Sequence, residues 1–157
     1  MGNGVEIERK FLVREPPGDL GDWDATSIEQ GYLAITDDVE VRVRRRDAQA
    51  TLTIKSSPAR RRVEEELEIG ERRFASLWPL TEGRRVVKVR YTREAAPGVV
   101  LELDVYAGDL EGLMTLEVEF ADEAAAEAFT PPPWAGPEVT GDPRYANQAL
   151  ATAGRPE

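Results

Sequence analysis

Hydrophobic and polar residues alternate with a period of two along most of the chain, as they do where successive side chains point to opposite faces of a β-strand. The pattern predicts eight strands, at residues 4–13, 27–35, 38–46, 50–56, 62–70, 84–93, 98–107 and 113–121. Short helices are predicted at 71–78, at 122–129 and from near Asp142 onward. We therefore expect a mainly β (α+β) fold, an eight-stranded antiparallel β-barrel tunnel with a few peripheral helices.

The polar faces of these strands are separated by the sign of their charge. Basic residues fill alternate positions of some strands: Arg42, Arg44 and Arg46, then Lys55, then Lys88 and Arg90. Acidic residues fill alternate positions of others: Glu6 and Glu8, Glu64, Glu66 and Glu68, Glu102 and Asp104, Glu117 and Glu119. A solvated sheet face normally mixes the two signs, because like charges on neighbouring strands repel. The segregation favours a shared internal cavity whose ligands neutralise the charge, and an ordinary solvated face is the plainer alternative.

The first predicted strand contains the most informative segment, Glu6-Ile7-Glu8-Arg9-Lys10. Its two glutamates and its lysine point to one face of an extended strand, with the carboxylates about 7 Å apart. Two like charges so close on one strand face repel each other, but the pair suits a divalent cation held between the carboxylates. The lysine beside them would then hold an anion.

Composition narrows the ligand and the chemistry. A length of 157 residues predicts a single domain over 1–157. The net charge of −10 predicts no nonspecific affinity for nucleic acid. A basic cluster in so acidic a chain indicates a small anion such as a polyphosphate. The chain has neither cysteine nor histidine, which excludes thiolate chemistry, Ser-His-Asp triads and His-ligated metals. A metal must be held by oxygen, which favours Mg²⁺ or Mn²⁺.

The absence of histidine also restricts the general base for water. Water must be activated by the metal, by a carboxylate of the acidic strands, or by a lysine whose pKa is lowered by neighbouring cations. Lys10 and Lys88 are the lysine candidates. No apolar stretch approaches the length of about 18 residues that a membrane span needs, so a cytoplasmic protein is expected. An outward-facing apolar barrel surface makes a homodimer a further expectation.

An ordered series of motifs resembles one family. The series comprises Glu6-Ile7-Glu8-Arg9-Lys10, Gln30-Gly31-Tyr32-Leu33, Thr51-Leu52-Thr53-Ile54-Lys55, Lys88-Val89-Arg90-Tyr91, Leu101-Glu102-Leu103-Asp104-Val105, Glu117-Val118-Glu119-Phe120 and Arg144-Tyr145-Ala146-Asn147. It is similar to the CYTH superfamily, the triphosphate tunnel metalloenzymes, and especially to compact bacterial members that hydrolyse inorganic tripolyphosphate. The first motif is the family's ExExK signature, which is weak alone but specific within the series.

The resemblance implies roles for individual residues. It implies that metal ions are held by Glu6, Glu8, Asp104, Glu117 and Glu119. It implies that the triphosphate is gripped by Lys10, Arg42, Arg44, Lys55, Arg85, Lys88 and Arg90. Glu64 and Glu66 would orient water or a second metal and, with Lys10 and Lys88, form the catalytic set.

The expected activity is metal-dependent hydrolysis of a terminal phosphoanhydride of tripolyphosphate, a small-molecule substrate. Two other functions stay open on the sequence. One is a different enzyme on the same tunnel, an adenylate cyclase or a phosphatase of nucleoside or thiamine triphosphates, which would need a recess for the organic group. The other is a noncatalytic polyphosphate-binding module.

Overall fold

The computed structural model describes residues 7–56 and 63–156. Their strands are β1 (Ile7–Val13), β2 (Asp24–Ile35), β3 (Val39–Arg46), β4 (Gln49–Ser56), β5 (Glu64–Glu68), β6 (Arg85–Ala96), β7 (Val99–Ala107), β8 (Met114–Phe120) and β9 (Ala135–Glu138). The eight predicted strands are thus all present, and β9 is an addition. The expectation of a mainly β protein with a few helices is confirmed.

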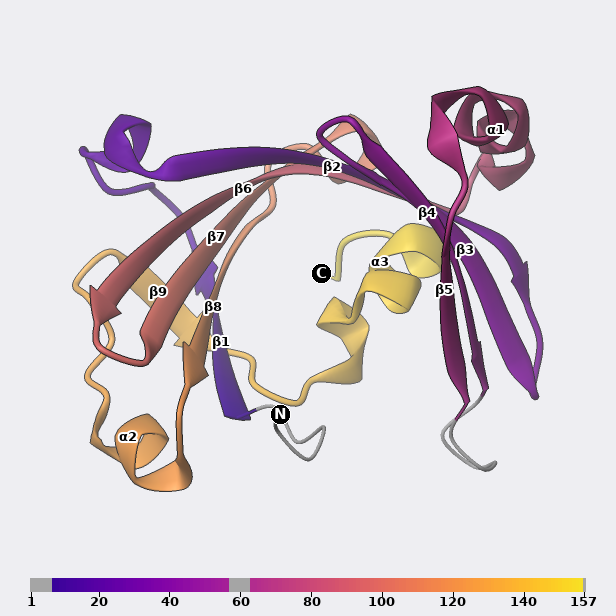
Figure 1. Ribbon diagram of the computed structural model, residues 1–157. Helices are drawn as coiled ribbons and strands as arrows, with labels where there is room; N and C mark the ends of the chain where they lie inside the picture. The colour runs from indigo at the N-terminus through magenta and orange to yellow at the C-terminus, as the bar shows by residue number, and fades with distance from the viewer. Residues whose placement is uncertain (1–6, 57–62, 157) are drawn as a thin grey trace.

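The strands form one antiparallel sheet in the order β5-β4-β3-β2-β6-β7-β8-β1-β9. The sheet arches so that β3, β4 and β5 face β1, β8 and β7 across a hollow (Figure 1). The expected closure into a barrel is not observed. The free side of β1 pairs with β9, through Phe11 opposite Glu138 and Val13 opposite Ala135, so that side of β1 is not available to β5.

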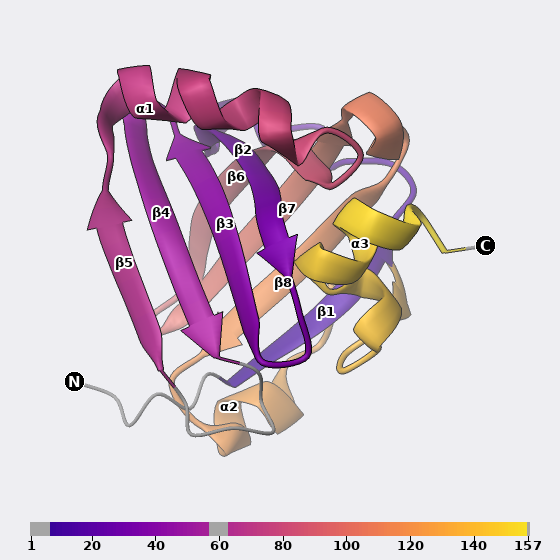
Figure 2. The ribbon, with the colours of Figure 1, turned by 90° about the vertical axis from the view of Figure 1, so that its right-hand side faces the viewer.

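The helices are α1 (Gly70–Leu77), α2 (Glu123–Ala128) and α3 (Asn147–Ala153), with 3₁₀ turns η1 (Leu20–Asp22), η2 (Trp78–Thr81), η3 (Gly108–Leu110) and η4 (Pro143–Tyr145). As expected, Asp122 caps α2, accepting a hydrogen bond from the Ala125 amide at 2.8 Å. Helices α1 and α2 lie outside the arch, but α3 lies inside it, so the expectation that the helices are peripheral is wrong for α3 (Figures 1 and 2). No helix within 7–56 and 63–156 is long and apolar enough to cross a bilayer.

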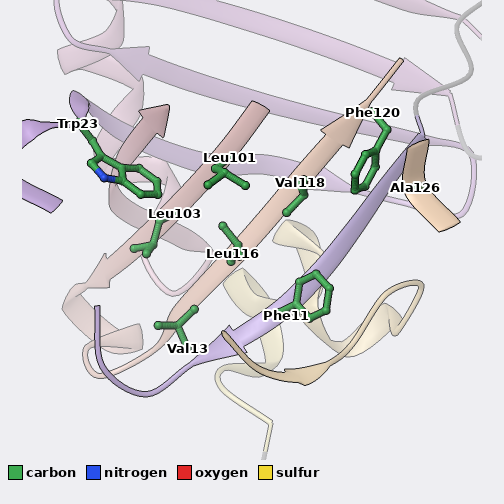
Figure 3. Close-up of a cluster of buried hydrophobic side chains, with 9 residues drawn as sticks. All are labelled: Phe11, Val13, Trp23, Leu101, Leu103, Leu116, Val118, Phe120 and Ala126. Carbon is green, nitrogen blue, oxygen red and sulfur yellow. The ribbon is translucent and has the colours of Figure 1, made fainter. Parts of the chain in front are cut away.

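Apolar side chains of β1, β7 and β8 form a core on the convex face of the sheet, covered by α2 (Figure 3). Phe11, Leu103, Leu116 and Val118 are each at most 2% exposed there. They occupy every second position, so their sequence neighbours point into the hollow. The alternation that builds this core therefore also directs the charged residues to the concave face.

A second core lies inside the arch, at one end of the hollow. Leu150 of α3 packs there in a cluster with Tyr32, Val86, Tyr106 and Leu110. This apolar contact holds α3 against β2 and β6. Because this apolar cluster fills one end of the hollow, the polar side chains of the concave face lie along the rest of the strands.

The pairing of β1 with β9 includes an ion pair whose strength depends on pH. Arg9 donates two hydrogen bonds to the Glu138 carboxylate, at 2.7 and 3.0 Å. Arg9, with the Thr140 hydroxyl, lowers the pKa of Glu138 to about 2. Because the folded-state pKa is depressed, the stabilisation is present above the unfolded-state value of about 4.3 and is lost as the pH falls toward 2.

We therefore expect Glu138→Gln to lower the melting temperature slightly at pH 7 and to flatten its decline between pH 4.5 and 2. The effect should stay small, because the pair is partly exposed and water screens it. Melting curves of both proteins across this pH range test the point. Parallel declines would assign the acid sensitivity to other carboxylates.

Candidate functional site

The concave face contains a cavity of about 240 Å³ between the arms of the arch. Its lining comprises Glu8, Gln30, Arg42, Arg44, Val86, Lys88, Arg90, Glu102, Glu117, Glu119 and Asn147. This central cavity brings together seven of the predicted site residues, from β1, β3, β6 and β8. Its basic residues come mainly from β3 and β6, and its acidic ones from β7, β8 and β1.

A neighbouring cavity of about 310 Å³ continues the central one toward η4. The two share Glu8, Lys88, Arg90, Glu117 and Asn147. The second cavity adds Lys10 and Asp104 to the predicted residues that meet on the concave face.

Four glutamates form an acidic wall across β7, β8 and β1. Glu8 lies directly opposite Glu119, and Glu117 lies directly opposite Glu102. Like charges in such positions destabilise a sheet. Burial raises the pKa of Glu102, and the charges of Glu119 and Glu117 raise it further, although Arg90 acts against them. A cation between these carboxylates would remove the repulsion.

The acidic wall suits a hard divalent cation in its chemistry, since every donor is a carboxylate oxygen. Within 7–56 and 63–156, no group of three or more acidic side chains is arranged to hold a metal ion as it stands. Glu6, the other metal ligand predicted on β1, lies outside the described residues. The wall thus offers the donor type that Mg²⁺ or Mn²⁺ prefers, on carboxylates that face each other across paired strands.

Opposite the acidic wall, Arg42 and Arg44 of β3 form a basic wall. The Nε atoms of both arginines are buried and have no hydrogen-bond partner among the described residues. Burial lowers the pKa of Arg44, and the charges of Arg42, Arg90 and Arg46 lower it further. A buried N–H without an acceptor costs about 1–3 kcal/mol, and more when it is charged. An anion in the central cavity would supply the missing acceptors.

Asp104 lies between the two bases of β6. Its carboxylate accepts from Lys88 Nζ at 2.8 Å and from Arg90 Nε and Nη2 at 2.8 and 3.0 Å. Burial acts to raise the pKa of Asp104, but Lys88 and Arg90 bring it below its ordinary value. Both oxygens are therefore engaged by cations. The prediction that Asp104 holds a metal is not supported by this geometry, which makes it the residue that positions Lys88 and Arg90.

Asp104→Asn should therefore destabilise the protein strongly. Lys88 and Asp104 are 4% and 3% exposed, so the substitution would leave a buried ammonium without its counter-charge. Losing one partner of a buried pair costs about 3–5 kcal/mol. Urea unfolding measures the change. Wild-type stability in Asp104→Asn would mean that Lys88 does not depend on this carboxylate.

The other predicted residues lie apart from the central cavity. Lys10 Nζ donates to the Tyr145 carbonyl at 2.8 Å, which ties β1 to η4. Lys55 pairs with Glu64 at 3.5 Å, and both line a third cavity, of about 680 Å³, that also contacts Arg42. Glu66 faces the same side of the exposed edge strand β5 as Glu64. The structure thus keeps the predicted catalytic glutamates away from the acidic wall.

Arg85 is the one predicted phosphate ligand that points to the convex face. Its guanidinium donates to Thr81 Oγ1 at 2.9 Å and to the Trp78 carbonyl at 2.7 Å, and it stacks over the Trp78 ring. Arg85 lies three positions before Lys88 along β6, an odd spacing, so the two point to opposite faces. The predicted phosphate contact is not supported by this position, which makes Arg85 the anchor of η2.

Two polar residues of the central cavity, Gln30 and Asn147, stand in the family-like motifs of the sequence but were not predicted to form the site. Gln30 is 3% exposed and donates to the Tyr32 hydroxyl at 3.0 Å. It lies on β2 directly opposite Arg44, a register that the sequence alone does not show. Asn147 comes from α3, whose place inside the arch no strand pattern could predict.

Comparison with known proteins gives consistent matches over nearly the whole chain. Residues 4–131 match the model of the CYTH domain family. The chain is 50% identical to an inorganic triphosphatase of Nitrosomonas europaea, covering 94% of this chain and 97% of that one. It is 38% identical to an inorganic triphosphatase of Acetivibrio thermocellus, with 94% and 93% covered.

Solved structures agree. The crystal structure of an inorganic triphosphatase superposes with a TM-score of 0.82 at 49% identity, covering 94% of this chain and 95% of that one. A Pyrococcus horikoshii protein at 20% identity has a TM-score of 0.51 over 78% of this chain and 82% of that one, which shows a shared fold alone.

Proposed function

The chain belongs to the CYTH domain family, and on that premise we propose that it hydrolyses inorganic triphosphate in its concave cavity. The observation that carries the proposal is the pair of buried Arg42 and Arg44 Nε atoms without acceptors, opposite a wall of facing glutamates. One wall needs an anion and the other needs a cation. A triphosphate accompanied by divalent ions supplies both.

In this proposal the substrate binds across the two walls. Arg42 and Arg44 donate to phosphate oxygens, and Arg90 holds a fixed positive charge on β6 because Asp104 orients it. Glu8, Glu117 and Glu119, with Glu102, would hold Mg²⁺ or Mn²⁺, which when bound offsets charge on the phosphoryl oxygens. These arginine charges need no rearrangement as charge moves to the leaving group.

Water attacks the terminal phosphorus, and the bond to the departing pyrophosphate breaks. We assign the proton of that water to the neutral form of Lys88, which burial favours because it lowers the pKa of Lys88 against the raising effect of Asp104. Asp104, 2.8 Å away, would stabilise the ammonium that forms. Neither a covalent intermediate nor a side-chain nucleophile is needed.

The relatives favour inorganic triphosphate as the substrate, since both are named inorganic triphosphatases. One observation favours a second class, nucleoside triphosphates. The third cavity adjoins Arg42 and has Tyr32, Val39 and Val63 in its lining, so it offers a partly apolar recess beside the phosphate site.

Substrate comparison tests the proposed function. With purified protein and Mg²⁺ or Mn²⁺, kcat/KM should be highest for tripolyphosphate, lower for ATP and lowest for pyrophosphate. Pyrophosphate has too few phosphates to pair with all the bases. The adenosine of ATP would have to lie outside the central cavity, whose lining is mostly charged, and reach into the third cavity. A kcat/KM for ATP at or above that for tripolyphosphate would identify a nucleoside triphosphatase instead.

A further inference from the structure

Thr53, in the middle of β4, is a buried hydroxyl without a partner. It is 3% exposed, and its Oγ1 makes no hydrogen bond to any described residue. Buried hydroxyls are nearly always satisfied, so the exception needs an explanation. A valine would fill the same space without leaving a polar atom unsatisfied.

The neighbours of Thr53 indicate what its hydroxyl could meet. Thr53 lies directly opposite Arg42 on β3 and opposite Glu66 on β5, with all three side chains on the concave face. Arg42 Nε is also buried and unpartnered. Side chains that face each other across neighbouring strands have Cβ atoms about 4.5–5.5 Å apart. Two unsatisfied groups therefore lie next to each other at the base of the basic wall.

Three of the buried side-chain atoms without a hydrogen-bond partner among the described residues lie close together on the concave face. Within 7–56 and 63–156, the unsatisfied buried side-chain atoms are Trp23 Nε1, Arg42 Nε, Arg44 Nε and Thr53 Oγ1. Trp23 belongs to the convex core, whereas the other three lie on the concave face of the adjacent strands β3 and β4. Arg42 and Arg44 line the central cavity there, and Thr53 lies directly opposite Arg42. The hydroxyl and the two guanidinium N–H groups can all donate, and an anion would accept from all three.

We propose that Thr53 is a substrate-contacting residue, whose hydroxyl donates with Arg42 Nε to one oxygen of the bound triphosphate. This proposal rests on the proposed function and extends it, because it places the binding site of one phosphate group at β3 and β4. That phosphate would lie on the side of the cavity away from the acidic wall. The hydrogen bond exists only in the complex, so the free protein gains nothing from the hydroxyl.

The test compares Thr53→Val, which keeps the shape and removes the hydroxyl, with Thr53→Ser, which keeps the hydroxyl. Thr51→Val is the matched control, because Thr51 lies on the same strand and the same face but is only half-buried. Each protein is assayed for kcat and KM with tripolyphosphate. Its melting temperature is measured alone and with tripolyphosphate in chelator, where turnover is not expected.

Thr53→Val should lower kcat/KM about ten- to a hundredfold, the effect of one hydrogen bond to a charged group. Its melting temperature without ligand should be equal to or above that of the wild type, and its shift with tripolyphosphate should shrink. Thr53→Ser should recover most of kcat/KM, and Thr51→Val should match the wild type.

A lower melting temperature of ligand-free Thr53→Val, with kcat/KM unchanged, would overturn the inference and assign the hydroxyl to the fold. Unchanged kinetics and an unchanged ligand shift would also overturn it, while leaving the proposed function intact. Failure of the wild-type protein to bind or cleave tripolyphosphate would instead reject the proposed function.

Discussion

Excess EDTA should abolish tripolyphosphate hydrolysis, with a fall of about a thousandfold or more, and added Mg²⁺ or Mn²⁺ should restore it. The reason is the acidic wall, where Glu8 faces Glu119 and Glu102 faces Glu117 across paired strands. Without a cation these carboxylates would repel the phosphates that the basic wall attracts. A bound divalent ion contributes several kcal/mol to a phosphoryl-transfer transition state, and each 1.4 kcal/mol is about tenfold in rate.

Single substitutions refine this expectation. Glu119→Gln should raise the Mg²⁺ concentration needed for half-maximal rate, and additional Mg²⁺ should recover part of the loss. Glu65→Gln is the matched control, because it removes the same charge from the opposite, convex face of the sheet. Full activity in excess EDTA, or equal Mg²⁺ requirements for the two variants, would contradict the metal role of the acidic wall.

Arg42→Ala should lower kcat/KM for tripolyphosphate about 100- to 1000-fold, with no recovery at high Mg²⁺. Arg42 lines the central cavity, and its Nε has no acceptor among the described residues. A hydrogen bond to a charged group contributes about 1.5–3 kcal/mol, and a guanidinium offers more than one donor. The loss should appear in kcat/KM, because it removes stabilisation of the bound triphosphate and of its transition state.

Arg85→Ala is the matched control for Arg42→Ala. It also removes a guanidinium, but one whose hydrogen bonds go to Thr81 and Trp78 on the convex face. It should lower the melting temperature and leave KM unchanged. If Arg85→Ala lowered kcat/KM as much as Arg42→Ala, the loss could not be assigned to the position of Arg42 on the concave face.

Much of the fold could be predicted because strand alternation is a local property. Strand β6, predicted at 84–93, spans Arg85–Ala96, and the apolar positions of β7 and β8 form the convex core as expected. Strand β9 was missed because Gly136 and Pro137 interrupt any alternation. It forms at the edge of the sheet, where a proline without an N–H is tolerated.

The site could be predicted where it depends on alternation alone, and not where it depends on register or on packing of distant segments. Arg42, Arg44, Lys88 and Glu117 meet at one cavity as expected. The pairing of Asp104 with the bases of β6 depends on the register between β6 and β7, which no spacing shows. The contribution of α3 depends on apolar packing inside the arch. For Arg85 the sequence did hold the signal, since its odd spacing from Lys88 indicates the opposite face.

The central claim is that the concave cavity cleaves a phosphoanhydride rather than merely holding a polyphosphate. Phosphorus NMR of purified protein with tripolyphosphate and Mg²⁺ tests this most directly, because it follows substrate and products together. The account predicts that tripolyphosphate disappears while orthophosphate and pyrophosphate accumulate in equal amounts. Tripolyphosphate signals that shift or broaden on binding but keep their total intensity, with no product, would contradict it and identify a noncatalytic polyphosphate-binding module.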